Sequence, residues 1–513
     1  MITRNLKFLN RFFKFFYFYK NLIEEIAVLY YNKVVLNIGG MYMSIADLAA
    51  SAVKALSKSS GRKLKRKMTA PPISDHVAKQ FSGNKYKVGF SKCEVMPDDL
   101  DTATYWIAGH AMAKKIEGVH DPITVSAMWI GCDDNGSILM VSADIVGLTR
   151  VEVAKIRDML SHLKAKGCKS INICCTHNHA GFDTVGYWGK LPKTGKNPSY
   201  MNKLFDSICK VCNEAYENRT EGDLYFGTIH VPEAQFDKRP PEVLHDVLSR
   251  IRFVPDNGDK ETWFLNFAAH PNTLGGSNRL VSADYPHFLR ETIYDKKDVN
   301  VLFGIGAIGA VDPGNFCEEK WERTRLQGEC LGNAALAIKD ERKLACDVAV
   351  LRQPYYTPVE NSVLAFLASL KVMSSKRYPC DKGELGLALK SEITYIRLGD
   401  QKILLLPGEC FPETIYGGYD TEETSATGKG PEINPQPLVE IAGDENLLVF
   451  GVTNDMTGYV VPPNDFTLHK TQPYLSNGRD RFDRSHYHET NSLGYLSQET
   501  IAEVFRKVVN NMK

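Results

Sequence analysis

Hydrophobic and polar positions beyond about residue 86 change repeatedly between the twofold period of a strand and the longer period of a helix. Residues 127–130 and 137–146 are apolar runs on either side of Asp133-Asp134-Asn135-Gly136, which predicts a β-hairpin. Thr149 and Glu152 have the spacing of a capping box. They therefore predict a helix that ends at Gly167 and carries an apolar face made by Val153, Ile156, Leu160 and Leu163.

The rest of the chain continues this alternation. We predict strands at 171–175, 224–230, 250–253, 262–268, 301–305, 393–398, 402–406 and 447–452, and helices at 201–218, 323–337 and 497–512. Strands and helices interleave, yet several strand pairs are joined as hairpins, so the sheets should be mixed rather than wholly parallel. The expected fold is α/β, with mixed β-sheets flanked by helices in a single large catalytic domain at 86–513.

Residues 1–75 form a leader of different composition. Segment 1–20 is basic and aromatic, too often charged to span a membrane and without the apolar core of a signal peptide. It is either a helix that makes weak membrane-surface contact, or a segment outside the mature protein, with Met41 or Met43 as a later start. We favour the second interpretation. A short helix at 44–56 and a solvated basic linker at 57–67 complete a leader that we expect to be disordered or absent from the mature protein.

Composition narrows the class of protein. The 513 residues are 43% hydrophobic and 24% charged, as in ordinary soluble globular proteins. A formal net charge of +1 gives no indication of a nucleic-acid partner. None of the 12 cysteines has zinc-finger spacing, and Cys209 and Cys212 lie in an amphipathic run, so we expect core-facing thiols there. Free cysteines in this number favour a reducing compartment, so we expect a cytoplasmic or membrane-peripheral protein.

Two histidines mark the end of one predicted strand. The apolar run 171–175 is followed by Thr176-His177-Asn178-His179. If the chain is still extended there, residues i and i+2 point to the same face, and both imidazoles converge at the carboxyl end of the strand. Such a pair suits metal binding or acid–base chemistry, although two ordinary loop histidines are the alternative.

Three more predicted strands end in the same way. They deliver His270, Glu409 and Tyr459 into loops. Each residue alone is equally well explained as an ordinary polar loop residue. Together they favour a metal site, because zinc accepts histidine nitrogen and carboxylate oxygen and leaves a position for water when the site is catalytic.

These motifs resemble a known family. Residues 176–181 (THNHAG), 266–270 (NFAAH), 406–409 (LPGE) and 453–459 (TNDMTGY) are similar in order and spacing to the catalytic domain of the neutral/alkaline ceramidases. The resemblance runs from Tyr86 to the C-terminus and includes 109–112 (GHAM), 118–122 (GVHDP) and 142–144 (SAD). The family's C-terminal immunoglobulin-like domain has no counterpart in this sequence.

The resemblance implies roles for eight residues. The zinc ligands would be His177, His270, Glu409 and Tyr459. The second histidine of the T-H-x-H motif, His179, would face substrate. Arg239 resembles the active-site arginine, Tyr487 the second active-site tyrosine, and Asp312 stands where the family has its serine. Asp312 would then be either the general base or a structural residue of an Asp-Pro turn.

The resemblance also implies an activity. We expect Zn²⁺-dependent hydrolysis of an amide bond in a small-molecule or ceramide-like lipid substrate with an N-acyl group, through metal-activated water. His179 and Arg239 would donate to the developing oxyanion. The alternatives are an esterase or another amidohydrolase on the same metal site, or a binding protein that has lost catalysis. Another borderline metal ion is an alternative to zinc.

Overall fold

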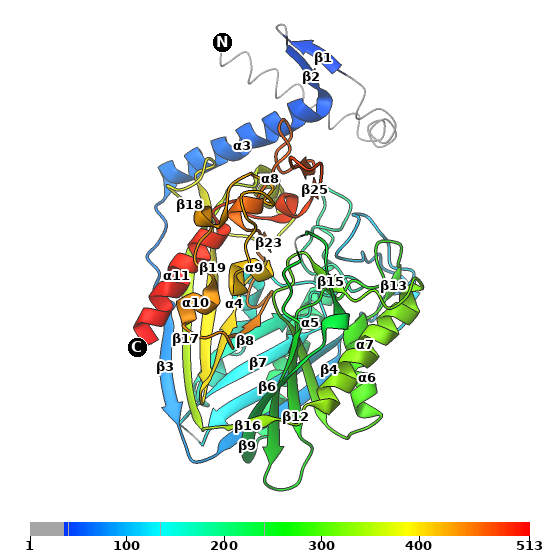
Figure 1. Cartoon of the computed structure of the whole chain (residues 1–513), viewed down its shortest axis with the longest axis vertical. Coiled ribbons are helices and arrows are strands. Elements are labelled where there is room, and N and C mark those ends of the chain that lie inside the picture. Colours follow the sequence, from blue (N-terminus) through cyan, green and yellow to red (C-terminus); the bar gives the residue numbers. More distant parts are fainter. Residues whose placement is uncertain (1–34, 39–40, 134, 241, 513) are drawn as a thin grey trace.

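Two β-sheets, packed face to face, form the centre of the protein (Figure 1). The computed structural model describes residues 35–38, 41–133, 135–240 and 242–512. From edge to edge, the larger sheet contains β14 (Asn300–Ile305), β12 (Thr262–Phe267), β11 (Val247–Pro255), β9 (Thr220–His230), β4 (Tyr86–Glu94), β6 (Thr124–Cys132), β7 (Gly136–Ala143) and β8 (Cys168–Cys175), while β16 (Glu341–Leu344) pairs with β9.

The smaller sheet completes the mixed architecture. Its order is β22 (Leu448–Phe450), β20 (Gln401–Leu405), β19 (Leu387–Leu398), β17 (Asp347–Val359) and β3 (Val77–Ser82), with β18 (Arg377–Pro379) on β19. The pairs β7/β8, β12/β14 and β20/β22 are parallel, and the other pairs within the two large sheets are antiparallel. The predicted α/β fold with mixed sheets in one large domain is confirmed.

Helices cover both outer faces of this sandwich. The core between the sheets joins residues such as Met128 and Phe264 of one sheet to Ile396 and Phe450 of the other. Helices α4 (Arg150–Met159), α5 (Pro198–Glu217), α6 (Tyr285–Tyr294) and α7 (Lys320–Ala337) bury their apolar sides on the larger sheet, and α10 (Leu438–Ala442) and α11 (Ser497–Met512) on the smaller one. The sequence therefore folds into four layers, helix, sheet, sheet and helix.

Helix α5 illustrates how the sequence specifies this layer. The Asn197 side chain caps its start by accepting from the backbone N–H groups of Ser199 and Tyr200. Buried positions then recur every three or four residues, at Leu204, Ile208, Val211, Cys212 and Ala215. Cys212 is buried and Cys209 packs beside the same core, and both are free thiols, so the prediction of core-facing cysteines is confirmed.

Helix α3 (Ile45–Lys67) corrects one prediction. The segment 57–67 is not a solvated linker, because the helix continues through it and packs on the domain (Figure 1). Ser57 Oγ donates to the Ser362 carbonyl at 2.9 Å, and a Cβ at Gly61 would lie 1.9 Å from the Leu385 carbonyl oxygen. Ser57 and Gly61 therefore lie on the face of α3 that packs on the domain. The many lysines and arginines around them make this face hard to predict from the sequence.

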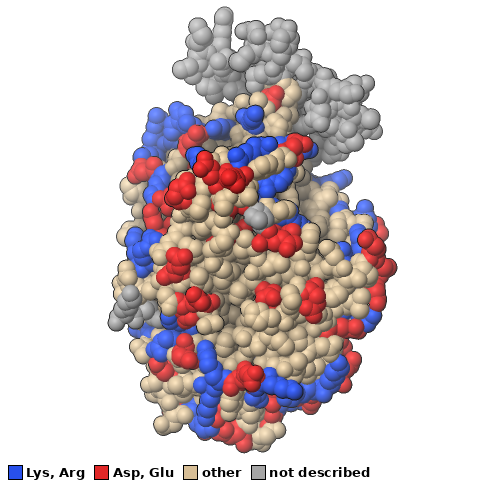
Figure 2. Space-filling model, viewed as in Figure 1, with Lys and Arg blue, Asp and Glu red and all other residues tan. Residues whose placement is uncertain are grey.

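The remaining expectations for the leader fall largely outside the described residues. Segment 1–20, with its proposed membrane-surface contact, belongs to that part of the chain. Among the described helices, none combines the length and the apolar character needed to cross a membrane. Acidic and basic side chains are interspersed over the face shown in Figure 2.

Hydrogen bonds tie the carboxyl ends of strands from both large sheets together. Strand twist of roughly 20–25° per neighbour turns the edges of a wide sheet towards each other, and here Ser142 Oγ of β7 donates to the Phe303 carbonyl of β14 at 2.6 Å. Beyond the strands, Gly451 N donates to the Ile305 carbonyl and Asn454 N to the Ile173 carbonyl, both at 2.9 Å. The loops that follow β8, β12, β14, β20 and β22 therefore meet at one place.

Candidate metal centre and its cavity

Two imidazoles and one carboxylate converge where these loops meet. Glu409 Oε2 lies 3.2 Å from His177 Nε2 and 3.1 Å from His270 Nε2. All three side chains are buried. His177 follows β8, His270 follows β12 and Glu409 begins β21 (Glu409–Cys410), so residues far apart in the sequence share one centre.

The hydrogen bonds of the two histidines orient their free nitrogens. Each Nδ1–H donates to a backbone carbonyl, that of Val146 at 2.7 Å for His177 and that of Val311 at 2.8 Å for His270. Because a carbonyl only accepts, the proton of a neutral ring lies on Nδ1, and both Nε2 lone pairs point at Glu409. Three acceptors facing one point fit a bound cation.

The charges of His177 and Glu409 shift each other's pKa. Burial lowers the pKa of His177, but the adjacent Glu409 carboxylate raises it by more, and the net shift is upward. Burial also raises the pKa of Glu409, whereas His177 and His270 lower it, and the net result lies well below the usual glutamate value. Glu409 is therefore an anion that positive charge must compensate in its buried position.

Two tyrosines extend the centre on one side. Tyr459 begins β23 (Tyr459–Val460), which pairs in parallel with β21 so that Tyr459 stands directly beside Glu409. Their side chains are hydrogen-bonded, and the Tyr459 hydroxyl is also hydrogen-bonded to that of Tyr487. Burial, and then the negative charge of Glu409, raise the pKa of Tyr459 well above its usual value. A phenol oxygen next to three other donor atoms is a fourth candidate ligand.

His179 closes the other side of the centre. Its ring lies 4.8 Å from that of His177 and 5.0 Å from that of His110, centroid to centroid. Neither of its ring nitrogens has a hydrogen-bond partner among the described residues, although both are buried. Burial, and then nearby positive charge at His177, lower its pKa well below the usual value, which leaves a neutral imidazole at neutral pH.

These positions allow two overlapping donor sets. Ligand atoms of His177, His179 and His270 lie within 4.8 Å of one another. The set implied by the resemblance shares His177 and His270 and adds Glu409 and Tyr459. The contacts of Glu409 with both Nε2 atoms favour the second set, and they leave His179 free to meet substrate.

The backbone around the centre is strained. His177 has φ 59°, and Val452 and Asn454 in the neighbouring loop have φ 40° and 65°. A left-handed conformation costs an L-residue roughly 1–2 kcal/mol, and a β-branched one more. The bonds from Cys175 N to the Val452 carbonyl and from Val452 N to the Gly408 carbonyl hold this loop in place.

This strain corrects the expected origin of the histidine pair. His177 and His179 do approach each other, but not as alternate residues of an extended strand. Strand β8 ends at Cys175, and the chain turns at His177. Gly109 permits the close packing that follows, because a Cβ there would lie 2.3 Å from the His179 ring and its φ is +95°.

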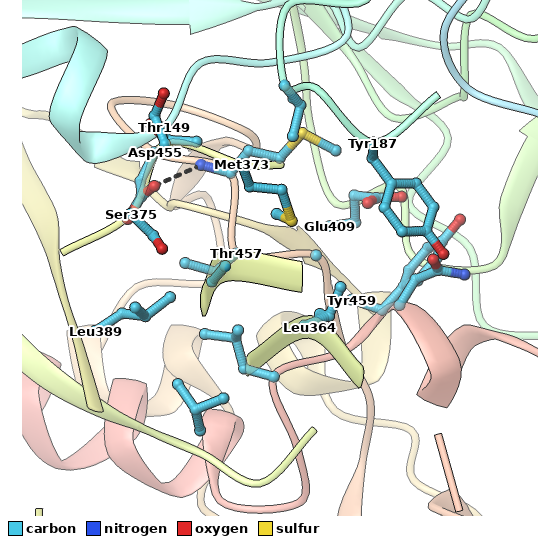
Figure 3. A pocket seen from close by; sticks show the side chains of 18 of the residues that line it. Thr149, Tyr187, Leu364, Met373, Ser375, Leu389, Glu409, Asp455, Thr457 and Tyr459 are labelled. Carbon is cyan, nitrogen blue, oxygen red and sulfur yellow. Dashed lines mark hydrogen bonds between the residues drawn. The ribbon is translucent and has the colours of Figure 1, made fainter. Parts of the chain in front are cut away.

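A cavity of about 520 Å³ opens beside the centre. His177, His179, Glu409, Tyr459 and Tyr487 line one part of it. Apolar side chains, several from helix α8 (Ser362–Ser369), line much of the rest, namely Val359, Leu364, Ala365, Ala368, Met373, Leu387, Leu389 and Leu493. Polar and charged side chains, among them Arg150, Lys376, Arg377 and Asp455, also line it. Figure 3 shows Glu409 and Tyr459 on one side of the cavity and Leu389 across from them.

The two remaining predicted site residues lie beside this cavity rather than in its lining. The Arg239 guanidinium is paired with Asp465 and Glu489, at 2.5 and 3.1 Å, and contacts His486 Nδ1 at 2.7 Å. Asp312 is paired with Lys238 and accepts from Asn272 Nδ2 at 2.9 Å. Among the described residues that line the cavity, neither Arg239 nor Asp312 appears.

Sequence reasoning missed the apolar part of the cavity and one cation. Helix α8 and Met373 carry no motif, and only the folded structure places them in the same cavity lining as Glu409. The cation is Lys238, which directly precedes Arg239 in the sequence. Lys238 and Arg239 follow the end of β10, and the structure pairs them with different carboxylates, Asp312 for Lys238 and Asp465 and Glu489 for Arg239.

Comparison with known proteins addresses the fold. No family model matches the sequence, and a search of curated proteins found no match. Among solved structures, the neutral ceramidase from Pseudomonas aeruginosa is similar with a TM-score of 0.63 and 17% identity, over 83% of this chain and 74% of that one. This chain has the fold of a neutral ceramidase.

A second structure agrees with this result. A ceramidase complexed with C2 has a TM-score of 0.61 and 15% identity, over 83% of this chain and 75% of that one. At such identities the likeness to the ceramidases concerns the fold, so function rests on the centre and the cavity described above.

Proposed function

We propose that this protein is a ceramidase-like, metal-dependent hydrolase that cleaves the amide bond of an N-acyl lipid. The observation that carries the proposal is the convergence of His177 Nε2, His270 Nε2 and Glu409 Oε2 at one wall of an apolar cavity. Metal-competent donors beside a pocket with a large apolar wall are the combination expected of a catalytic site for a lipid.

The donor set suits a divalent ion, with zinc as the best candidate. His177, His270, Glu409 and Tyr459 would hold it, and the backbone carbonyls behind both histidines fix their tautomers. A bound ion supplies Lewis acidity there, which polarises a carbonyl and makes water a better nucleophile near neutral pH.

Two side chains of the cavity are placed for proton transfer and charge stabilisation. Burial, and then the charge of His177, keep the pKa of His179 well below its usual value, and neither ring nitrogen has a hydrogen-bond partner among the described residues. This imidazole can accept a proton from attacking water and return it to the leaving amine. The Tyr487 hydroxyl faces the same space and can donate to the oxygen that becomes negative during attack.

The apolar part of the lining supports the acyl side of the proposed substrate. Leu364, Leu389, Leu493 and Met373 offer hydrocarbon surface to a chain whose carbonyl lies near Glu409. Each buried methylene contributes about 0.8 kcal/mol, so a long chain binds far better than a short one. An ester of the same acid would fit equally well, and the assay must therefore include one.

Elemental analysis and hydrolysis together test the proposal. Purified protein should contain about one equivalent of zinc and should hydrolyse an N-acylated amine with a long chain faster than the matched ester. His177→Ala and Glu409→Ala should lose both metal and activity. His162→Ala is the matched control, since His162 is exposed and contacts Asn213.

Three outcomes would contradict it in different ways. Retention of full zinc content by both variants would refute the ligand assignment. Faster turnover of the ester would establish an esterase on the same site. Binding of the lipid without turnover in the metal-loaded protein would show a binding protein.

A further inference from the structure

Lys238 contacts a side chain that lines the cavity. Its ammonium forms an ion pair with Asp312 and donates a hydrogen bond to the Tyr487 hydroxyl. Tyr487 lines the cavity and is hydrogen-bonded to Tyr459. A polar chain therefore runs from Asp312 through Lys238 and the two tyrosines to Glu409.

The backbone fixes both members of the ion pair. Lys238 N donates to the Ala310 carbonyl at 3.0 Å, next to the pairing of β10 (Gln235–Asp237) with β15 (Val311–Pro313). Asp312 lies in β15, and its other carboxylate oxygen accepts from Asn272 Nδ2 at 2.9 Å. One oxygen of Asp312 thus pairs with Lys238 and the other accepts from Asn272, and Asp312 is not among the residues that line the cavity.

The charge of Lys238 acts on the cavity. Burial, and then the charges of Lys114 and Lys238, lower the pKa of His110, a ring that lines the cavity. One third of the Lys238 side chain (33%) is exposed, so the charge is screened only in part. The Arg239 guanidinium, by contrast, forms ion pairs with the buried carboxylates of Asp465 and Glu489.

We propose that Lys238 is a positioning residue of this site, that it holds and polarises the Tyr487 hydroxyl, and that Asp312 is its counter-ion rather than a general base. A hydroxyl whose oxygen accepts from an ammonium becomes a stronger donor to a developing oxyanion. The inference rests on the proposed function and assigns the cationic role to Lys238 instead of Arg239.

The first test compares two ligands that need no turnover. Decanoate and decanol share a chain but differ in charge, and calorimetry gives the affinity of each for the purified protein. Lys238→Met should reduce the preference for decanoate over decanol on the order of tenfold, the usual value of one charge-assisted hydrogen bond. Lys238→Arg should keep most of it. Lys343→Met, which removes a lysine from the surface pair with Asp223, is the matched control.

The second test concerns catalysis. Lys238→Met should lower kcat on the order of tenfold and leave KM for a neutral amide nearly unchanged, because the polarised hydroxyl acts mainly on developing charge. Asp312→Asn should lower kcat by no more than Lys238→Met does, and the double variant should lower kcat no further than either single variant. Loss of a general base would instead cost about 100- to 10,000-fold.

The outcomes separate this inference from the function on which it rests. If the wild type hydrolyses amides and prefers decanoate, but Lys238→Met behaves like Lys343→Met, the role of Lys238 is refuted and the function stands. A loss of activity in Asp312→Asn far beyond that of Lys238→Met would refute the counter-ion role. If the wild type binds neither ligand and hydrolyses nothing, both proposals fail. Thermal unfolding of each variant confirms that it is folded, and Lys238→Gln replaces Lys238→Met if the latter is not.

Discussion

If the proposed function is correct, filling the apolar part of the cavity should shorten the acyl chain that the protein accepts. Ala368 lines the cavity from α8 and is half-buried, so Ala368→Phe places a ring in the space assigned to the chain. Its neighbour Ser369 is exposed and outside the cavity lining, and Ser369→Phe adds the same ring to the same helix as a control.

The magnitude follows from the hydrocarbon that is displaced. Each methylene contributes about 0.8 kcal/mol, which is about a fourfold change in affinity. In the wild type, kcat/KM should therefore rise about fourfold per added methylene until the chain fills the cavity of about 520 Å³. A ring that displaces three methylenes costs about 2.4 kcal/mol, or about fiftyfold, for a long chain and almost nothing for a short one.

The assay is a chain-length series. We would measure kcat/KM for N-acyl substrates from four to sixteen carbons with the wild type, Ala368→Phe and Ser369→Phe. The rise should stop at a shorter chain in Ala368→Phe alone. Parallel profiles for all three proteins would refute the assignment of this cavity to the acyl chain.

Three further predictions concern stability. Arg239→Met should destabilise the fold by about 3–5 kcal/mol, since it leaves Asp465 and Glu489 buried without their cation, and a urea midpoint equal to that of the wild type would contradict this. Glu392 is fully buried (0% exposed) and paired with Arg157, which helps to hold its pKa below the usual value against the effect of burial. The ionised Glu392 carboxylate therefore stabilises the fold above about pH 4.3, and this stabilisation is lost as the pH falls through the folded-state pKa. The free energy of unfolding of Glu392→Gln should consequently fall less steeply in acid than that of the wild type. Removal of the metal with a chelator should lower the melting temperature of the wild type but not that of Glu409→Ala, and equal shifts in both proteins would place the ion elsewhere.

Periodicity in the sequence predicted most of the fold. Each strand and helix predicted beyond residue 86 is present, and most ends are shifted by a few residues. The helix predicted to end at Gly167 instead ends at Met159 and is followed by a short 3₁₀ helix at Ser161–Lys164. The capping box at Thr149 is present, since Thr149 N donates to the Glu152 carboxylate at 2.8 Å. Such elements are specified locally, by capping side chains and by apolar positions at regular spacing.

Strand β17, which lies between β19 and β3 in the smaller sheet, could not be predicted from the sequence. Pro354 and Pro358 interrupt its apolar pattern, and proline argues against an interior strand. The structure resolves this conflict, because β17 pairs with β3 only from Asp347 to Arg352. Both prolines lie beyond that stretch, where one side of β17 has become an edge.

Part of the candidate site could also be predicted from the sequence. His177, His270, Glu409 and Tyr459 each follow a predicted strand, and the structure brings them together where those strands end. The pairings of Lys238 and of Arg239 depend on contacts across long stretches of chain. No local pattern specifies such contacts, so only the folded structure shows which of these neighbours serves the site.

The most direct test of the account is the position of a zinc ion in crystals of the metal-loaded protein, located by anomalous scattering at the zinc edge. We predict one strong peak about 2.0–2.2 Å from His177 Nε2, His270 Nε2 and a Glu409 oxygen. A peak at any other place, or the absence of a peak from these three side chains in protein that hydrolyses its substrate, would contradict the central claim.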